Sequence, residues 1–200
     1  MGALFTLALV VGLSVAGDSA DARFPGENGS IACEGGRGPA APEGGSRQEI
    51  FSINPDGTDE RRLTNNTVTD IDPVYSPDGK RIAFASTRTG TTQIFVGSAD
   101  GDLEGPDVIQ LTDSPGGHRQ PSWSPDGTQL VFHSGRPAEF PDLPAPVGDV
   151  EIYSMSAITG EAGGVQRLTR NRGQDAIPAW SPDGSRIAFQ TLREATPTTS

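Results

Sequence analysis

The sequence is poor in cysteine, histidine, aromatic residues and positive charge, and these shortages exclude several classes of protein. Cys33 is the single cysteine among 200 residues, so the chain can form neither an internal disulfide nor a cysteine-based zinc site. Lys and Arg number 15 against 26 Asp and Glu, which gives a net charge of −11. Nucleic-acid binding needs clustered cations, and we therefore predict no nucleic-acid partner.

Recognisable catalytic and metal-binding motifs are missing as well. The sequence contains no G-x-S-x-G, H-E-x-x-H or phosphate-loop pattern, and its two histidines are too few and too separate to indicate a catalytic triad. The segment Asp100–Gly105 opens like an EF-hand loop, but its twelfth position is Leu111, which cannot supply the carboxylate that calcium needs. We predict no catalytic residue, no metal and no cofactor.

A single apolar run opens the chain. Residues 3–16 are uncharged and apolar over 14 residues, which is too short for a membrane span and typical of a signal peptide. Ala20 and Ala22 offer a cleavage site, although no Lys or Arg precedes the run. We expect residues 1–22 to be a signal peptide, the protein to be periplasmic or secreted, and no membrane span to remain after cleavage. The alternative is a buried apolar strand or helix.

An internal repeat determines the predicted fold. A ten-residue pattern around Ser-Pro-Asp-Gly occurs as Tyr75–Phe84, Trp123–Phe132 and Trp180–Phe189, with a degenerate copy at Asn28–Cys33. Ser and Pro favour a type I turn and Gly accepts the left-handed position after it, so the pattern predicts a hairpin. Cys33 occupies the position of the three phenylalanines, and we expect it to be a small buried hydrophobic residue.

Each repeat continues with Ile-Phe or Ile-Tyr and ends with Leu-Thr, which gives four short antiparallel strands per unit of 48 or 57 residues. This is the period of a β-propeller blade. Residues 28–64 supply three strands, 72–112 and 121–169 a full blade each, and 177–191 two strands, followed by a polar tail at 195–200. We predict an all-β propeller of about three blades over residues 23–194. Because a closed ring needs roughly four to eight blades, we expect a partial gene product with open edges that allow self-association.

The pattern P-x-[WY]-S-P-D-G-x-x-[IL]-[AV]-F, followed by I-[FY] and L-T, resembles the WD40-like propeller repeat of TolB and its bacterial relatives. The same repeat forms the propeller of prolyl-oligopeptidase-type enzymes. The resemblance covers residues 24–191 and is specific for the fold rather than for a function. It implies an exported, non-enzymatic scaffold that binds a protein or peptide. The alternatives are the propeller of a larger hydrolase or lyase, where it gates substrate access, and a nonfunctional truncation.

Loops that vary in length all fall at one end of the predicted blades, and this end is the candidate binding face. By the resemblance, the strand before Ser-Pro-Asp-Gly is the innermost, so the residues at its start should line the rim of a central channel. These candidates are Asp70, Asp72, His118, Arg119, Gln120 and Asp175. The alternative is that they hydrogen-bond neighbouring blades, and we expect His118 to be a solvated loop residue.

Two further features lie at the same predicted end. An arginine follows the second strand four residues after the aromatic position in every copy, as Arg37, Arg88, Arg136 and Arg193. We predict that these arginines are structural clamps and that Arg88 reaches Asp70 or Asp72. The insert 135–149 carries four prolines with Phe140 and Leu143, which is typical of a stiff loop that contacts a partner; the alternative is an insertion without a role.

Overall fold

The computed structural model describes residues 29–36, 47–136, 150–170 and 173–192. Within these ranges the chain forms strands and turns, with no helix and therefore no helix that could span a bilayer. The strands are β1 (Ile31–Gly35), β2 (Glu49–Ile53), β3 (Arg61–Arg62), β4 (Asp70–Tyr75), β5 (Arg81–Ser86), β6 (Gln93–Ser98), β7 (Ile109–Gln110), β8 (His118–Trp123), β9 (Gln129–Ser134), β10 (Glu151–Ser156), β11 (Gly160–Arg167), β12 (Asp175–Trp180) and β13 (Ile187–Thr191).

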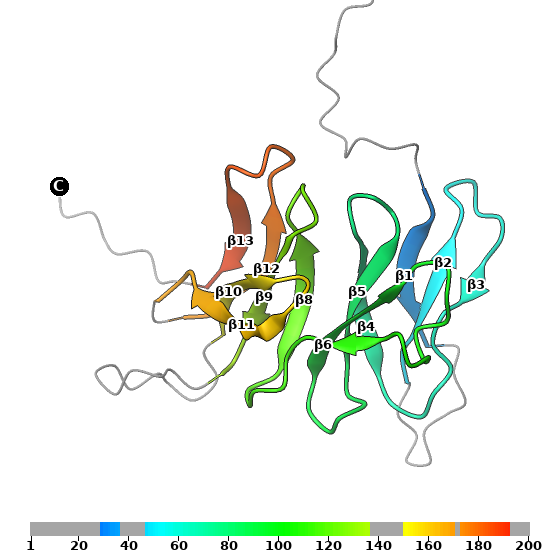
Figure 1. Ribbon diagram of the computed structural model, residues 1–200, viewed down its shortest axis with the longest axis horizontal. Coiled ribbons are helices and arrows are strands. Elements are labelled where there is room, and N and C mark those ends of the chain that lie inside the picture. The colour runs from blue at the N-terminus through cyan, green and yellow to red at the C-terminus, as the bar shows by residue number, and fades with distance from the viewer. Residues whose placement is uncertain (1–28, 37–46, 137–149, 171–172, 193–200) are drawn as a thin grey trace, which may run out of the picture.

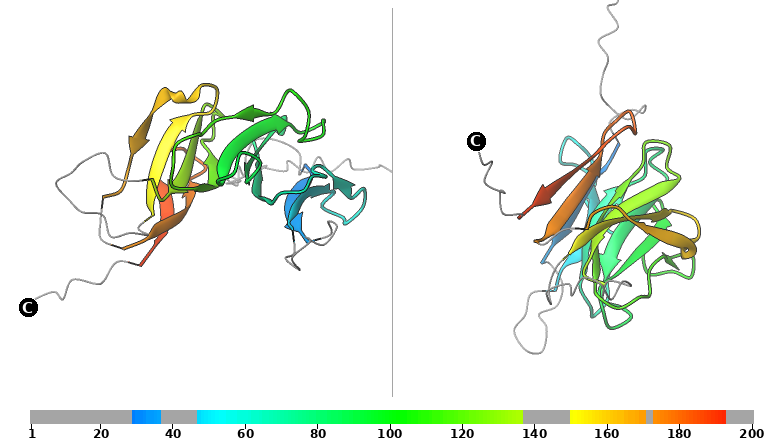
Figure 2. Two further views of the ribbon diagram at one scale, coloured as in Figure 1. Left: turned by 90° about the horizontal axis from the view of Figure 1, so that it is seen from below. Right: turned by 90° about the vertical axis from the view of Figure 1, so that its left-hand side faces the viewer.

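These strands form four antiparallel sheets in chain order. Sheet 1 has the order β1-β2-β3, sheet 2 β4-β5-β6-β7, sheet 3 β8-β9-β10-β11 and sheet 4 β12-β13. The sheets follow one another across the molecule in a curved row, from β1–β3 at one end to β12–β13 at the other (Figures 1 and 2). Strands β4, β8 and β12 are the inner strands, and consecutive ones contact each other. The predicted all-β architecture of an unclosed propeller is confirmed.

Apolar side chains fill the spaces between neighbouring sheets. One cluster joins sheets 1 and 2 through Ile50 and Leu63 on one side and Ile82 and Phe84 on the other. A second cluster joins sheets 2 and 3 and is centred on Trp123, whose side chain is 2% exposed. The Trp123 indole N–H donates to the Val74 carbonyl at 3.2 Å. The core of this protein therefore lies between sheets, and each sheet depends on its neighbour for burial.

The Ser-Pro-Asp-Gly turns have the predicted hairpin geometry. In the first, Gly79 N–H donates to the Ser76 carbonyl at 2.8 Å, and Gly79 has a φ of 69°. The Ser76 hydroxyl donates to Asp78 Oδ1 at 2.6 Å, which closes the turn with a side-chain bond. In the last turn the equivalent bond from Ser181, together with Ser185, lowers the pKa of Asp183 to about 2. Each aspartate is therefore a hydrogen-bonded turn residue.

Each inner strand carries a bulge at its third residue. Asp72, Gln120 and Ile177 have φ values of 54°, 53° and 54°, and each precedes a proline. A residue before proline is disfavoured in the right-handed helical region, and the bulge places two residues opposite one on the neighbouring strand. The left-handed conformation is tolerable for Asp and strained for a β-branched residue. Ile177 is also 51% exposed, so little packing offsets its strain.

We predict that Ile177→Asn stabilises the protein by about 1 kcal/mol, because asparagine accepts the left-handed conformation that isoleucine resists. Equilibrium urea unfolding measures the change. Ile158→Asn is the matched control, since Ile158 is a 71% exposed isoleucine without a positive φ. Equal stabilisation in both variants would assign the effect to lost apolar exposure and contradict the backbone explanation.

Candidate functional site

One end of the sheets gathers the loops that lead into the inner strands and those that leave the second strands. Thr87, just after β5, donates its N–H to the Thr69 carbonyl just before β4 at 3.0 Å. Leu192, just after β13, likewise donates to the Gln174 carbonyl just before β12 at 2.9 Å. The two kinds of loop therefore lie at the same end of their sheets. We call this end the loop face.

Arg88 forms the ion pair that the sequence predicts. Its Nη2 lies 3.1 Å from Asp70 Oδ1, and its Nη1 donates to the Leu103 carbonyl at 3.0 Å. The guanidinium carbon lies 5.0 Å and 4.9 Å from the ring centroids of Phe84 and Phe95. Arg88 thus covers the aromatic core of sheet 2 and joins it to the start of the inner strand.

Sheet 3 has a histidine where sheet 2 has Asp70. His118 is fully buried, so the expectation of a solvated loop residue is wrong. Its Nε2 lies 2.9 Å from the Ser114 carbonyl oxygen, and burial lowers the pKa of the ring, which favours the neutral form. A neutral imidazole offers Arg136 no negative charge, and Arg136 pairs instead with Glu161 on β11. The arginine position is thus used in both sheets with different partners.

Burial divides the predicted rim residues into two groups. Asp70, His118 and Asp175 each begin an inner strand and are 0% exposed. We therefore correct their predicted position at the channel rim, because a fully buried side chain cannot meet a ligand there. The neighbouring residues Arg119 and Gln120 remain at the surface, as do Asp72 and Ile177. We call these four residues the inner rim.

Three residues of the inner rim form a hydrogen-bonded ridge across sheets 2 and 3. Asp72 Oδ2 accepts from Arg119 Nε at 3.0 Å and from the Gln120 N–H at 3.2 Å. Glu34 of sheet 1 accepts the Asp72 N–H at 2.7 Å, so one carboxylate after another bridges consecutive sheets. The left-handed conformation of Asp72 accompanies this bridge to the next sheet. The Arg119 side chain stays 44% exposed and is fixed through Nε.

His133 lies on β9 beside the inner rim. It pairs in register with Arg119, and its Nδ1 is buried without a hydrogen-bond partner among the described residues. Burial lowers the pKa of His133 to about 4, while Asp72 acts in the opposite direction and Arg119 adds to the lowering. His133 is therefore neutral near pH 7. The equivalent residues on β1, β5 and β13 are Glu34, Ala85 and Gln190. Among the described residues, sheet 3 is therefore the one sheet with a histidine at this position.

A buried polar belt, which sequence reasoning missed, supports the loop face. Strands β2, β6 and β10 each have an isoleucine as their second residue. The backbone N–H of this isoleucine donates to the hydroxyl of the threonine in the Leu-Thr pair of the same sheet, at 2.8–2.9 Å. The same hydroxyl donates to a buried side chain one residue earlier. The buried residues are Glu49, Gln93 and Glu151, paired with Thr64, Thr112 and Thr169. The signal in the sequence is the Glu or Gln directly before Ile-Phe or Ile-Tyr.

Charge in this belt is balanced sheet by sheet. Glu49 pairs with Arg62 at 2.8 Å, and Glu151 pairs with Arg167 at 2.8 Å. In sheet 2 the acid is replaced by Gln93, and the arginine position holds Gln110, whose amide donates to the Thr112 carbonyl at 2.7 Å. Arg167 makes the equivalent bond to the Thr169 carbonyl at 2.8 Å. The belt therefore accepts either an ion pair or a neutral pair.

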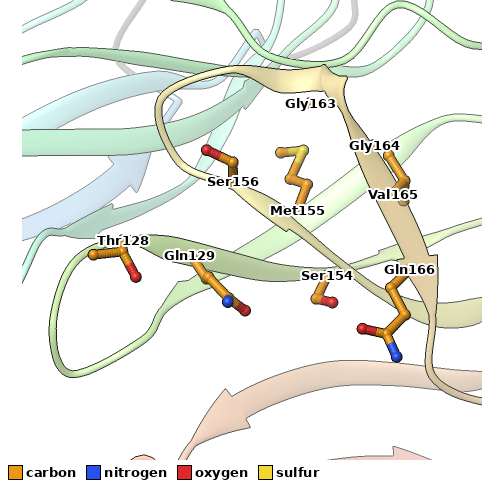
Figure 3. Close-up of a pocket in the computed structure, with 9 residues that line it drawn as sticks. All are labelled: Thr128, Gln129, Ser154, Met155, Ser156, Gly163, Gly164, Val165 and Gln166. Carbon is orange, nitrogen blue, oxygen red and sulfur yellow. The ribbon is translucent and has the colours of Figure 1, made fainter.

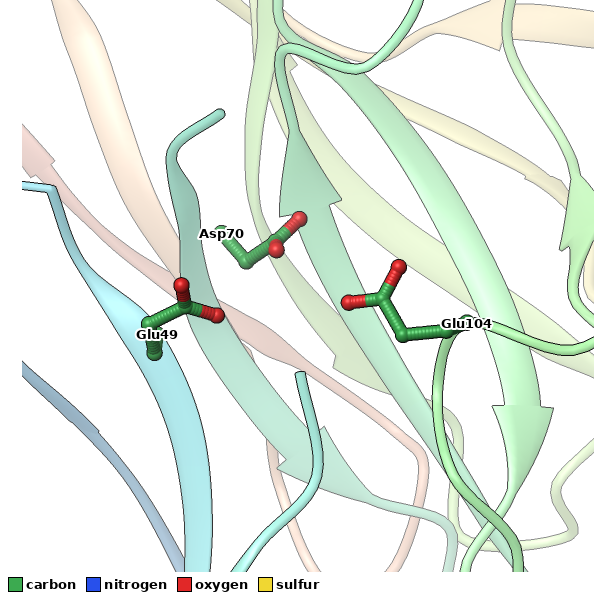
Figure 4. Close-up of side chains that lie close together, drawn as sticks. All are labelled: Glu49, Asp70 and Glu104. Carbon is green, nitrogen blue, oxygen red and sulfur yellow. The ribbon is translucent and has the colours of Figure 1, made fainter. Parts of the chain in front are cut away.

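Carboxylates come together where sheets 1 and 2 meet. Glu49, Asp70 and Glu104 bring oxygens within 4.8 Å of one another (Figure 4). Each is already occupied: Arg62 binds Glu49, Arg88 binds Asp70, and Glu104 accepts amide groups of the loop before β4. Two guanidinium groups thus supply the positive charge that a metal would supply. We assign this cluster to the packing of the sheets.

The structure also has an open pocket of about 550 Å³ on sheet 3 (Figure 3). It lies where β11 departs from its register with β10, between Met155 and Ser156. Its lining side chains are hydroxyls, amides and a few apolar groups, and none is charged. The lining residues are Thr128, Gln129, Ser154, Met155, Ser156, Gly163, Gly164, Val165 and Gln166.

Several predicted features fall outside the described residues. Phe140 and Leu143 of the insert, the arginines Arg37 and Arg193, the signal peptide at 1–22 and the tail at 195–200 all lie there. Cys33 is described and is exposed, so its predicted burial is wrong. Its equivalents Phe84 and Phe132 are buried because a preceding sheet covers them, and among the described residues no sheet precedes sheet 1.

Known proteins with similar sequences include a TolB homologue. An uncharacterized protein of Agrobacterium fabrum is 36% identical over 141 residues, which is 70% of this chain and 46% of that protein. A TolB homolog of Chlorobium chlorochromatii is 33% identical over 147 residues, 73% of this chain and 29% of the homolog. A dipeptidyl-peptidase 5 of Porphyromonas endodontalis is 33% identical over 79 residues, 40% of this chain and 11% of that enzyme. The chain spans less than half the length of these curated relatives. No family profile matches the chain.

A solved structure described as TolB from Agrobacterium tumefaciens matches with a TM-score of 0.58 and 28% identity, covering 84% of this chain and 61% of that one. The strand order, the repeat and this likeness define a β-propeller with four-stranded antiparallel blades, present here as an incomplete arc. The repeat and the fold of this chain are those of the TolB-like β-propellers.

We predict that Arg167→Gln costs about 3 kcal/mol, because it leaves the Glu151 carboxylate buried without its cation. Adding Glu151→Gln should recover most of that loss, since sheet 2 shows that a neutral pair fits the same position. A double-mutant cycle by urea unfolding measures the coupling. Additive losses in the double variant would contradict the proposed balance of charge.

We predict that stability falls as the pH drops from about 6.5 to about 4. The pKa of His133 is about 4 in the folded protein and about 6.5 in the unfolded chain, so acid protonates the unfolded state first and favours unfolding. The stability that neutral His133 contributes is complete above pH 6.5 and is lost as the pH approaches 4. Because His133 is partly exposed, we expect roughly 2 kcal/mol.

His133→Gln, which copies Gln190 of β13, should flatten the pH dependence by this amount relative to the wild type. Thermal unfolding at several pH values between 4 and 7 provides the comparison. His118 is unchanged in both proteins, so its own lowered pKa cancels from the difference. If stability depended on pH in the same way in both proteins, His133 would not be the group responsible.

Proposed function

We propose that this protein is an exported, non-enzymatic propeller scaffold that binds a protein or peptide partner through its loop face. The observation that carries the proposal is the inner rim. Arg119 is fixed by Asp72 and stays exposed beside Gln120, on strands that the neighbouring sheets hold rigid. Hydrogen-bonding groups fixed in this way lose little entropy on binding and suit a polypeptide ligand.

The composition of the inner rim supports this choice of ligand. Arg119 offers donors, Asp72 offers a carboxylate, and Ile177 adds an exposed aliphatic surface on the next sheet. A peptide has the same mixture of polar backbone and apolar side chains. The insert 135–149 leaves β9 at the same face, and we propose that Phe140 and Leu143 extend the contact. The apolar segment 3–16 supports export to the periplasm or the medium.

Site-specific photo-crosslinking in bacterial cells tests this proposal. A photoreactive phenylalanine analogue at Gln120 should capture a distinct protein in the exported fraction. The same analogue at Lys80, an exposed residue in the turn at the opposite end of sheet 2, is the control. We expect an adduct from Gln120 alone, weakened at least about tenfold by Arg119→Gln. Adducts of equal yield from both positions, or none from Gln120, would reject the loop face as the binding surface.

Replacing residues 137–149 with a short glycine-serine linker gives a separate result, and it keeps Arg136, which pairs with Glu161. An unchanged adduct from Gln120 would remove the insert from the proposed contact and leave the inner rim in place. The linker joins β9 to β10 outside the residues that pair between these strands, so their register is kept. Far-ultraviolet circular dichroism verifies that the variant keeps its strands.

A second candidate function is the propeller part of a larger exported hydrolase or lyase. The similarity to dipeptidyl-peptidase 5 favours it, since this chain covers only 11% of that enzyme. Reading the genomic frame beyond Ser200 distinguishes the two candidates. A serine-hydrolase domain downstream would replace the scaffold proposal, and further propeller repeats alone would support it.

A further inference from the structure

A fully buried histidine anchors the connector 113–117, which joins the end of sheet 2 to β8 of sheet 3. His118 is 0% exposed, and its backbone N–H donates to the Thr92 carbonyl just before β6 at 2.9 Å. Its Nε2 lies 2.9 Å from the Ser114 carbonyl oxygen, so Nε2 carries the proton and donates. The other ring nitrogen, Nδ1, is then a bare acceptor, buried without a partner among the described residues.

Sheet 2 has an aspartate at the equivalent position, and the comparison shows what the histidine changes. Asp70 is an anion that pairs with the guanidinium of Arg88 at 3.1 Å. His118 lies near Arg136, the equivalent arginine, whose Nε is also buried without a hydrogen-bond partner in the described ranges. Protonation would place a second cation beside that guanidinium, together with a buried donor that has no acceptor, and both are costly. This interface therefore packs well only while His118 is neutral.

The connector is held against sheet 3 by two further contacts. Glu161 of β11 accepts the N–H groups of Asp113 and Ser114 at 3.0 and 3.1 Å, and the Ser114 hydroxyl at 2.8 Å. Gly116 lies against the residues that leave β9, since a Cβ built on it would come within 2.4 Å of the Arg136 backbone. The connector cannot move without disturbing both contacts, and it leads directly into the strand that carries part of the inner rim.

The groups around His118 favour its neutral form. Burial lowers the pKa of the ring and Arg136 lowers it further, while the Ser114 carbonyl, Glu161 and Asp113 act in the opposite direction. Other ionisable side chains on β8 and on the strands in contact with it are Arg119 of β8, Asp70, Asp72 and Tyr75 of β4, Arg81 of β5, His133 of β9 and Asp175 of β12. The net lowering shows that burial outweighs the nearby acids.

We propose that His118 is a pH-sensitive latch, which holds the connector 113–117 in place while it is neutral and releases the connector when it is protonated. Once the connector opens, water reaches the ring and its pKa returns to about 6.5. Acid therefore favours the open form below that pH. Each further pH unit makes opening about tenfold more frequent, as long as the closed form stays neutral. The latch acts whether or not the loop face binds a polypeptide.

Amide hydrogen exchange, followed residue by residue by NMR from about pH 7 to about pH 5, tests the latch. The reporter is the Asp113 N–H, which bonds to Glu161 when the connector is closed. The matched reference is the Asn65 N–H, which makes the equivalent bond to Glu104 in the connector that precedes Asp70. After correction for intrinsic exchange rates, protection of the Asp113 N–H should fall about tenfold per pH unit below about 6.5, and protection of the Asn65 N–H should not.

The carboxylate that binds the reporter does not itself titrate in this range. Burial would raise the pKa of Glu161, but the bonds from the connector and the ion pair with Arg136 lower it below its usual value. Glu161 therefore stays ionised down to about pH 5. A loss of protection over this range then reports the histidine rather than the acid.

Three substitutions assign the effect to one histidine. His118→Gln can still donate to the Ser114 carbonyl but cannot gain a proton, so protection of the Asp113 N–H should be equal at both ends of the pH range. His118→Asp, which copies Asp70 of sheet 2, gives the same test with a side chain that the repeat already accommodates. His133→Gln is the matched control and should keep the pH dependence of the wild type.

Three results would overturn the proposal. The first is protection of the Asp113 N–H that stays constant over the whole pH range in the wild type. The second is an equal fall at Ile94, whose N–H bonds to Thr112 in the buried polar belt, because the whole chain would then be unfolding. The third is loss of the pH dependence in His133→Gln but not in His118→Gln, which would assign the effect to the other histidine.

Discussion

The structure depends on the packing of each sheet against the next. A short antiparallel sheet of this kind has two faces and cannot bury either without a partner. Sheets 2 and 3 share the Trp123 cluster, and sheets 1 and 2 share the cluster around Ile82 and Phe84. Polar bonds reinforce the same contacts, as when Arg81 of sheet 2 donates to the Gly127 carbonyl of sheet 3. The burial of a residue is therefore set by its neighbouring sheet as much as by its own strand.

The polar belt shows how the same scaffold tolerates different charges. The position before Ile-Phe or Ile-Tyr is buried in every sheet that contains it among the described residues, and it holds an acid, an amide and an acid in turn. Each acid has an arginine on the adjacent strand, and the amide has a glutamine there. A buried carboxylate without a cation would cost several kcal/mol. The repeats thus keep the same hydrogen bonds, and where one repeat replaces the acid with an amide it also replaces the arginine with glutamine.

Sequence reasoning predicted the parts of the structure that repeat. The Ser-Pro-Asp-Gly turns and the ion pair between Arg88 and Asp70 follow from residue chemistry and the order of the strands. The burial of His118 did not follow, because a single histidine in a polar connector gives no sign of which side of the strand it occupies. The exposure of Cys33 was missed for another reason: the repeat position predicts burial only where a preceding sheet exists. Pattern alone identifies equivalent positions but not their surroundings.

The bulge of the inner strands fixes the backbone conformation of one residue without fixing the type of its side chain. Asp72, Gln120 and Ile177 share one backbone conformation, yet they are an acid, an amide and a hydrocarbon. The following proline and the doubled residue opposite the neighbouring strand set the shape, so the side chain is left to vary. The side chain at this position still affects stability, because a β-branched residue such as Ile177 resists the left-handed conformation that asparagine or aspartate accepts. A substitution at this position therefore changes the chemistry of the inner rim while the register shift that places it there stays with the strand pair.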